Sequence, residues 1–212
     1  MKSSIFSVAL VTLTTSAATT AHAATLTIEP DNYPDQTVLD HLIPGLTLSV
    51  TDAAETPSNF FTVTAITSPA GFQSTGTKVF AESNVDFWDP DFRLRMDFTN
   101  PVSGVSIDAI GGTNFNTDLG ILETYNAAGQ LLHTYTTQPL APNRIETMSI
   151  QDASPDIAFA VAYGIKGSAN SGPFLALDHL TLTNFTAPEP TTLTLLSSTA
   201  LPLLTRRRRQ PN

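Results

Sequence analysis

Short runs in which apolar and polar residues alternate recur between residues 24 and 186. Val, Ile, Thr and aromatic residues fill these runs, and Pro, Gly, Asn and Asp interrupt them, which is typical of half-buried β-strands. No long stretch has the spacing of three and four residues that an amphipathic helix requires. The pattern predicts strands at 25–28, 46–51, 60–66, 78–80, 92–98, 102–110, 119–125, 131–136, 145–150, 157–163 and 174–182.

The segment 92–98 shows how such a strand divides its two faces. Apolar and charged side chains alternate along it, so we expect one face in the core and the other in water. The apolar set is Phe92, Leu94, Met96 and Phe98, and the charged set is Arg93, Arg95 and Asp97. Many short strands without a repeat period predict an all-β, antiparallel sandwich or barrel.

Composition narrows the class of protein. With 41% hydrophobic residues, the 212-residue chain can build one core. It has no cysteine, which excludes a disulfide framework, a thiol nucleophile and a cysteine-ligated metal site. The formal charge of -9 opposes binding to nucleic acids, whose phosphates would be repelled.

Residues 1–23 have the pattern of a secretory signal peptide. Lys2 is followed by an apolar stretch from Ile5 to Leu13, which is too short to cross a hydrocarbon core of about 30 Å. Small residues at Ala21 and Ala23 suit a signal peptidase, which would cleave before Ala24. A buried first helix is the alternative interpretation.

The last residues, 187–212, combine three elements in a fixed order: a Pro-Glu-Pro tripeptide, an apolar segment at 191–205 and an arginine run. This combination resembles the PEP-CTERM sorting signal of exported bacterial surface proteins. The resemblance implies that a membrane-embedded exosortase processes the chain at the tripeptide, while a short hydrophobic helix anchors it transiently in the inner membrane. A disordered basic tail is the alternative. The residues that carry the resemblance are Pro188, Glu189, Pro190, Arg206, Arg207, Arg208 and Arg209.

Both processing events would change the charge of the exported domain. Removing Lys2, Glu189 and the four terminal arginines leaves 5 basic and 18 acidic residues, a formal charge of -13. That charge disfavours nucleic acids and anionic lipids further, and it favours neutral sugars or divalent cations as partners.

The region 24–186 resembles the jelly-roll domains that precede such sorting signals, and it is similar in layout to carbohydrate-binding jelly rolls and galactose-binding-like domains. The likeness rests on the order of the segments 27–52, 72–80, 92–112, 120–135 and 174–182. It implies an antiparallel β-sandwich of jelly-roll type. Because jelly rolls include lectins, enzymes and capsid proteins, the fold alone does not give the activity.

The stretch Asp86 to Asp91 is a candidate carbohydrate site. Trp88 could offer a flat face to a sugar ring, while Asp86, Asp89 and Asp91 accept hydrogen bonds from its hydroxyl groups. The alternative, which we favour, is that Trp88 fills the end of the core and the aspartates initiate turns. The four tyrosines could add to a sugar platform, but the sequence does not show which face each occupies: Tyr33, Tyr125, Tyr135 and Tyr163.

A structural calcium ion is a second candidate. Jelly-roll carbohydrate-binding domains often hold calcium between their first and last strands, and Glu29 and Asp178 occupy the corresponding places in the layout. Asp178 could instead point outward beside His179. No His-x-His or Glu-x-x-His pair is present, which makes a transition-metal site improbable.

The sequence shows few features of an enzyme active site. The exported region has three histidines and no Gly-x-Ser-x-Gly motif, and its many acidic residues need not form a glycosidase pair. We therefore predict a non-enzymatic protein of the cell surface or extracellular matrix that is structural or binds exopolysaccharide weakly. The alternatives are a structural protein without a small ligand and a secreted hydrolase active on polysaccharides.

Overall fold

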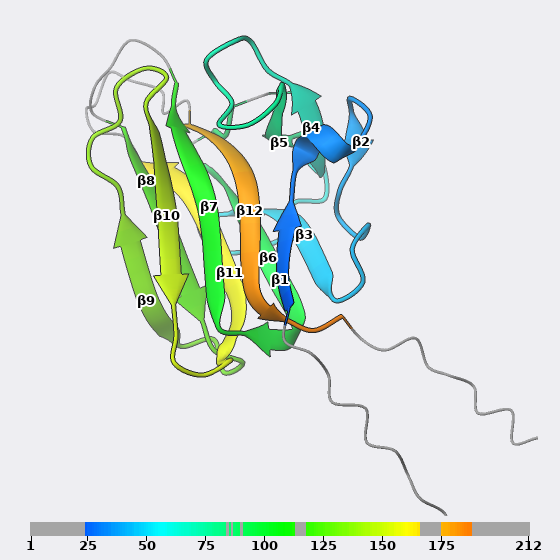
Figure 1. The fold of residues 1–212 in the computed structure, drawn as a ribbon, viewed down its shortest axis with the longest axis vertical. Coiled ribbons are helices and arrows are strands. Elements are labelled where there is room, and N and C mark those ends of the chain that lie inside the picture. Colours follow the sequence, from blue (N-terminus) through cyan, green and yellow to red (C-terminus); the bar gives the residue numbers. More distant parts are fainter. Residues whose placement is uncertain are drawn as a thin grey trace, which may run out of the picture.

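The computed structural model describes residues 24–83, 85, 87–89, 91–112, 118–165 and 175–187. Within these ranges two antiparallel β-sheets face each other and form a β-sandwich of jelly-roll type (Figure 1). Every strand pairing is antiparallel, as the alternating sequence pattern predicts.

One sheet has seven strands. Six of them lie in the order β10-β7-β12-β5-β4-β2, and the seventh, β1, also pairs with β12. β5 and β1 therefore occupy successive parts of the same edge of β12, and β7 occupies its other edge. A single 3-10 turn, Pro30–Asn32, follows β1. The strands of this sheet are β1 (Ala24–Ile28), β2 (Thr37–Val38), β4 (Val63–Thr67), β5 (Lys78–Glu82), β7 (Gly104–Gly111), β10 (Ile145–Gln151) and β12 (Leu175–Phe185).

The other sheet has five strands in the order β3-β6-β11-β8-β9. Its central strand β11 pairs with β6 and β8, which are distant from β11 in the sequence. The strands are β3 (Leu46–Asp52), β6 (Phe92–Val102), β8 (Leu119–Tyr125), β9 (Leu131–Thr136) and β11 (Ile157–Ile165).

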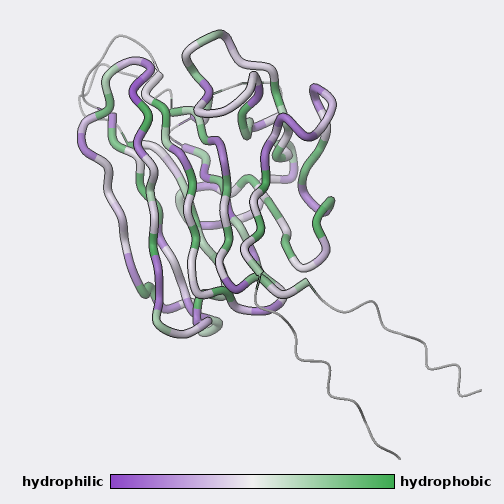
Figure 2. The backbone as a smooth tube through the Cα atoms, viewed as in Figure 1, coloured by the Kyte–Doolittle hydropathy of each residue, from purple (hydrophilic) through white to green (hydrophobic). Residues whose placement is uncertain are grey.

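The hydrophobic core lies between the sheets, and apolar and polar residues alternate along the backbone tube (Figure 2). On β6, Leu94, Met96 and Phe98 are buried in this core while the charged residues between them are half-buried on the outer side, as predicted. Ala24 pairs with Phe185, so the beginning of β1 lies beside the end of β12 (Figure 1).

Most of the predicted strands are confirmed, but the short strand β2 was not predicted, and several strand limits differ. The strand predicted at 60–66 begins only at Val63, because Phe60 and Phe61 lie in a loop and donate their backbone N–H groups to Ser58 Oγ. β6 continues to Val102, beyond its predicted end at 98. The next strand, β7, therefore begins at Gly104 and not at 102 as predicted. The predicted C-terminal helix lies outside the described residues, and no helix of the described residues is long and apolar enough to span a membrane.

Candidate functional site

Trp88 lies inside the sandwich and is not a sugar platform. The side chain is 0% exposed and belongs to the main core cluster. Its indole N–H donates a 2.8 Å hydrogen bond to the carbonyl of Phe80, and its backbone N–H donates to the carbonyl of Leu175. The hypothesis of an exposed Trp88 is therefore wrong, because the ring fills the end of the core and has no free face.

The aspartates around Trp88 have turn roles where they are described. Asp89 Oδ1 accepts a 3.0 Å hydrogen bond from the Asp91 backbone N–H, and the Asp89 carbonyl accepts one from Phe92. Both aspartates are exposed. This is the side-chain to backbone bonding that aspartate uses to start a turn. Asp86 lies outside the described residues.

Glu82, at the end of β5, is a buried carboxyl at the same end of the sandwich. Alternation along the strand places it on the core side with Phe80, and its Oε2 has no hydrogen-bond partner among the described residues. Burial raises the pKa of Glu82 to about 7; the backbone N–H of Asp89 lowers this pKa, and the charge of Asp89 raises it. The group is therefore a neutral acid over part of the physiological pH range.

Glu29 and Asp178 approach each other from the first and last strands, as the jelly-roll layout implies. They meet at the hydroxyl of Thr75, which donates to Glu29 Oε2 at 2.7 Å and lies 3.4 Å from Asp178 Oδ2. His179 Nδ1 contacts Glu29 Oε1. The meeting point lies at an irregularity in β12, where the register shifts between Asp178 and Thr181 and His179 takes a φ of 49°.

The donors around Asp178 do not suit a calcium ion. Its Oδ2 accepts hydrogen bonds from the backbone N–H groups of Ser74 and Thr75, at 2.9 and 3.0 Å, and its Oδ1 accepts from the N–H of His179. Calcium takes about six to eight oxygen ligands, whereas here the positive ends of three N–H dipoles point at the carboxylate. Among the described residues no group of three or more His, Asp or Glu is placed to hold a metal. The calcium site stays a prediction, and the pair is explained as a hydrogen-bonded anchor for the loop at Ser74 and Thr75.

The outer side of the five-stranded sheet carries a second cluster of large side chains that is separate from the core. On β11, Phe159, Val161 and Tyr163 point away from the sandwich interior, and Ile121 and Tyr125 of β8 pack against them. The Phe159 and Tyr125 rings are stacked with centroids 4.6 Å apart and planes 7° from parallel. An apolar cluster on the outer side of a sheet needs a cover or a ligand, since it would otherwise face water.

Two arginines of β6 supply much of that cover. The Arg95 guanidinium lies 3.8 Å from the centre of the Phe159 ring, and Arg93 lies 4.0 Å from the centre of Tyr163. Arg95, Phe159 and Tyr125 therefore form a three-layer stack across β6, β11 and β8. We name this surface the arginine–aromatic face. Its members are Arg93, Arg95, Asp97, Glu123, Tyr125, Phe159, Tyr163 and the loop residue Glu55.

Carboxylates hold Arg95 in place on this face. Asp97 accepts from Arg95 Nε and Nη2 at 2.8 to 3.0 Å, and Glu55 accepts from Nη1 at 2.9 Å. The hydrogen bonds that Arg95 donates to Asp97 raise the pKa of Arg95, so this cation is permanent. Tyr125 donates to Glu123 Oε2 at 2.8 Å, and burial, together with Glu123, raises the pKa of Tyr125 well above its usual range. The face thus presents fixed donors and acceptors beside aromatic rings.

Two of the four tyrosines considered in the sequence belong to this face, namely Tyr125 and Tyr163, whereas Tyr33 and Tyr135 pack against the main core. The sequence did not identify Phe159, Arg93 or Arg95 as site residues. The available indication was the strand 157–163, in which alanines alternate with larger apolar and aromatic residues, so that neither face is polar as one face of a half-buried strand normally is.

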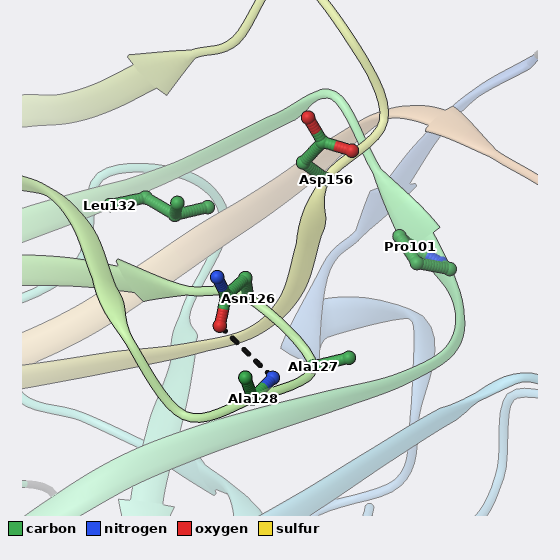
Figure 3. Close-up of a pocket in the computed structure, with 6 residues that line it drawn as sticks. All are labelled: Pro101, Asn126, Ala127, Ala128, Leu132 and Asp156. Carbon is green, nitrogen blue, oxygen red and sulfur yellow. Dashed lines mark hydrogen bonds between the residues drawn. The ribbon is translucent and has the colours of Figure 1, made fainter.

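A hollow of about 340 Å³ lies at the end of the sandwich beside the β8–β9 turn (Figure 3). Asn126 Oδ1 accepts from the backbone N–H groups of Ala128 and Gln130, so this side chain is used to hold the turn. Asp156 is bonded to Ser154 Oγ. The rest of the lining is apolar and small, and the hollow offers few free polar groups to orient a ligand. The lining residues are Pro101, Asn126, Ala127, Ala128, Leu132 and Asp156.

Of the predicted cleavage and sorting residues, Ala24 alone lies in the described part of the chain. Ala24 is the first residue of β1 and is exposed. The other predicted site residues of this kind are Ala21, Ala23, Pro188, Glu189, Pro190 and Arg206 to Arg209.

No protein-family model and no curated protein matches this sequence. Among solved structures, the chain is similar to the K2 cleaved adhesin domain of Lys-gingipain, with 10% identity, a TM-score of 0.47 and coverage of 76% of this chain and 99% of that one. It is similar to TmCBM61, solved with beta-1,4-galactotriose, at 12% identity, a TM-score of 0.42 and coverage of 64% and 86%. The C-terminal family 22 carbohydrate-binding module of Clostridium thermocellum Xyn10B gives 10% identity, a TM-score of 0.42 and coverage of 77% and 95%. A function must therefore be argued from the residues of this chain.

Proposed function

We propose that this chain is an exported surface or matrix protein that binds polysaccharide weakly through the arginine–aromatic face. The observation that carries the proposal is the stack of Arg95, Phe159 and Tyr125 on the outside of the five-stranded sheet. Both faces of the Phe159 ring are covered within the stack, so a sugar would contact the edges of the rings and the fixed hydrogen-bonding groups beside them. Such a surface suits sugars, whose C–H faces are apolar and whose hydroxyl groups both donate and accept.

The face is proposed to bind and not to catalyse. Asp97 and Glu55 are both paired with Arg95, whose guanidinium donates to both oxygens of Asp97 and to one oxygen of Glu55. A glycosidase needs one carboxyl that keeps its proton and a second that attacks or activates water. Paired carboxylates serve better as fixed acceptors for hydroxyl groups than as a proton donor.

The route to the surface is proposed from the two ends of the sequence. A signal peptidase would release the chain before Ala24, and an exosortase would process it at Pro188, Glu189 and Pro190 after transient anchoring in the inner membrane. Mass measurement of the native protein tests this route. We expect a species that begins at Ala24 and ends near Pro190, and a surface-exposed protein that keeps Arg206 to Arg209 would contradict it.

Retention on immobilised polysaccharides tests the binding. Tyr125→Ala removes one ring of the stack, and Phe159→Ala removes the ring between Arg95 and Tyr125. Ile145→Ala is the matched control, because Ile145 is an exposed apolar residue on β10 of the other sheet.

We expect both ring variants to lose retention while their circular dichroism spectra stay native and the control is retained. Retention that survives both changes would place binding elsewhere. A protein that no polysaccharide retains, but that co-purifies with matrix, would favour the alternative of a structural protein without a small ligand.

A further inference from the structure

Arg93 differs from the other positively charged side chains that the structure describes. The exported region has five basic residues, and the structure describes four of them. Three of these four have a carboxylate partner within 3.9 Å: Lys78, Arg95 and Arg144. No carboxylate of a described residue pairs with Arg93. In a region with 18 acidic residues, an unpaired guanidinium on an ordered strand calls for an explanation.

The position of Arg93 orients its donors. It is the second residue of β6, opposite Thr51 of β3, and its guanidinium stacks 4.0 Å from the centre of the Tyr163 ring. The side chain is half-buried, so stacking fixes the plane of the guanidinium while leaving it in reach of solvent. An arginine held in this way presents a planar set of N–H donors that matches a carboxylate.

The carboxylates on the same face are already engaged. Asp97 and Glu55 are paired with Arg95, and Glu123 accepts a hydrogen bond from the Tyr125 hydroxyl. These three groups therefore have partners of their own, and Arg93 is left as the cation of the face whose charge is available to a ligand.

We propose that Arg93 takes a carboxylate of a uronic acid residue, so that the arginine–aromatic face prefers acidic polysaccharides to neutral ones. This inference rests on the proposed polysaccharide binding and names its ligand class. It also reverses, for this surface, the expectation of neutral sugars drawn from the total charge.

The negative charge of the domain does not prevent such a contact. At physiological ionic strength, interactions between exposed charges fade beyond about 8 Å, so most of the 18 carboxylates act only weakly on a ligand at Arg93. The proposed contact is a short charge-assisted hydrogen bond beside the buried Tyr163 ring, which salt screens less.

The test uses pairs of polysaccharides that differ only in charge. Polygalacturonate is compared with its fully methyl-esterified form, and alginate with its ester, in binding titrations at physiological salt with the full chain. We expect the acid form to bind about tenfold more tightly, the size of effect that a hydrogen bond to a charged group gives. Arg93→Gln should bring the ratio of the two affinities close to one. The matched control is Arg144→Gln, which removes a cation just before β10 of the other sheet and should keep the wild-type ratio.

The outcomes separate this inference from the proposed function. Equal or tighter binding of the esters overturns the preference for acidic polysaccharides and leaves polysaccharide binding intact. An acid preference that persists in Arg93→Gln overturns the role of Arg93. If a neutral polysaccharide retains the protein but no member of the two pairs binds it, the inference is overturned as well. If no polysaccharide retains the protein, both the inference and the proposed function are overturned.

Discussion

Trp88 and Glu82 lie at the same end of the sandwich, and burial decides the role of each. Trp88 is fully buried, and its indole N–H is bonded to the carbonyl of Phe80. Glu82 is buried too, but one of its carboxyl oxygens has no partner among the described residues. One side chain therefore stabilises the fold, and the other makes its stability depend on pH.

The fluorescence of Trp88 should report a buried ring. Trp88 is the only tryptophan of the chain, so the signal is unambiguous. We expect a blue-shifted emission, weak quenching by acrylamide and no change when polysaccharide is added. Trp88→Ala should lower the free energy of unfolding by about 3–5 kcal/mol, because it removes a large buried ring. Emission that is readily quenched, or that changes on sugar binding, would restore Trp88 as a contact residue.

The Glu82 carboxyl should destabilise the fold as pH rises. Its pKa is near 4.5 in the unfolded chain and about 7 when folded, so the folded state binds more protons between these values. Its contribution is greatest below pH 4.5 and is lost on the way to pH 7, by about 3 kcal/mol at most.

Urea unfolding from pH 5 to pH 8 checks this expectation. Glu82→Gln should remove most of the decline, whereas Asp91→Asn, at an exposed carboxyl of the neighbouring loop, should leave it in place. An identical decline in wild type and Glu82→Gln would show that Glu82 is not the titrating group.

The existence of most strands follows from local sequence, whereas the face they build together does not. Alternation within β6 predicts which of its residues point inward. On β11 the alternation misleads, because Ala160 and Ala162 point inward while the larger side chains between them point outward. The stack of Arg95, Phe159 and Tyr125 depends on the order β6-β11-β8 and on the register of both pairings, which join segments far apart in the chain. Nothing local to those residues reveals their partners.

The meeting of Glu29 and Asp178 was predictable from the jelly-roll layout, but its chemistry was not. The residue between them, Thr75, belongs to the loop that connects β4 and β5. This loop closes against β12 where β1 ends and β5 begins. Asp178 ties the loop to β12, and Thr75 joins the loop to Glu29. Loop conformation is not encoded in strand periodicity, which is why the contact could not be seen in the sequence.

The stability that the anchor at β12 gives the fold should not depend on a bound metal. It should fall when the Asp178 carboxylate is removed. Asp178→Ala leaves the backbone N–H groups of Ser74 and Thr75 without an acceptor, and we expect a loss of about 3 kcal/mol. Asp178→Asn keeps one acceptor oxygen and should cost less. Thermal unfolding with excess calcium or with EDTA should give the same midpoint. A midpoint that rises with calcium, and no longer rises in Asp178→Asn, would support a metal site instead.

The two outer faces of the molecule differ in chemistry. On the seven-stranded sheet, small hydroxyl residues line up across four strands, whereas the five-stranded sheet carries the arginine–aromatic face. The hydroxyl row consists of Ser149, Ser106, Thr181 and Thr27. The arginine–aromatic face combines rings with fixed charges, so it is the face on which we expect a polysaccharide to lie.

Mapping the bound polysaccharide by NMR tests this expectation most directly, using a polysaccharide that retains the purified protein. The shifts should concentrate on the outward residues of β6, β8 and β11, including Arg93, Phe159 and Tyr163, and should spare the hydroxyl row of the other sheet. Shifts confined to the hydroxyl row or to the loop around Trp88, with the arginine–aromatic face unchanged, would contradict it.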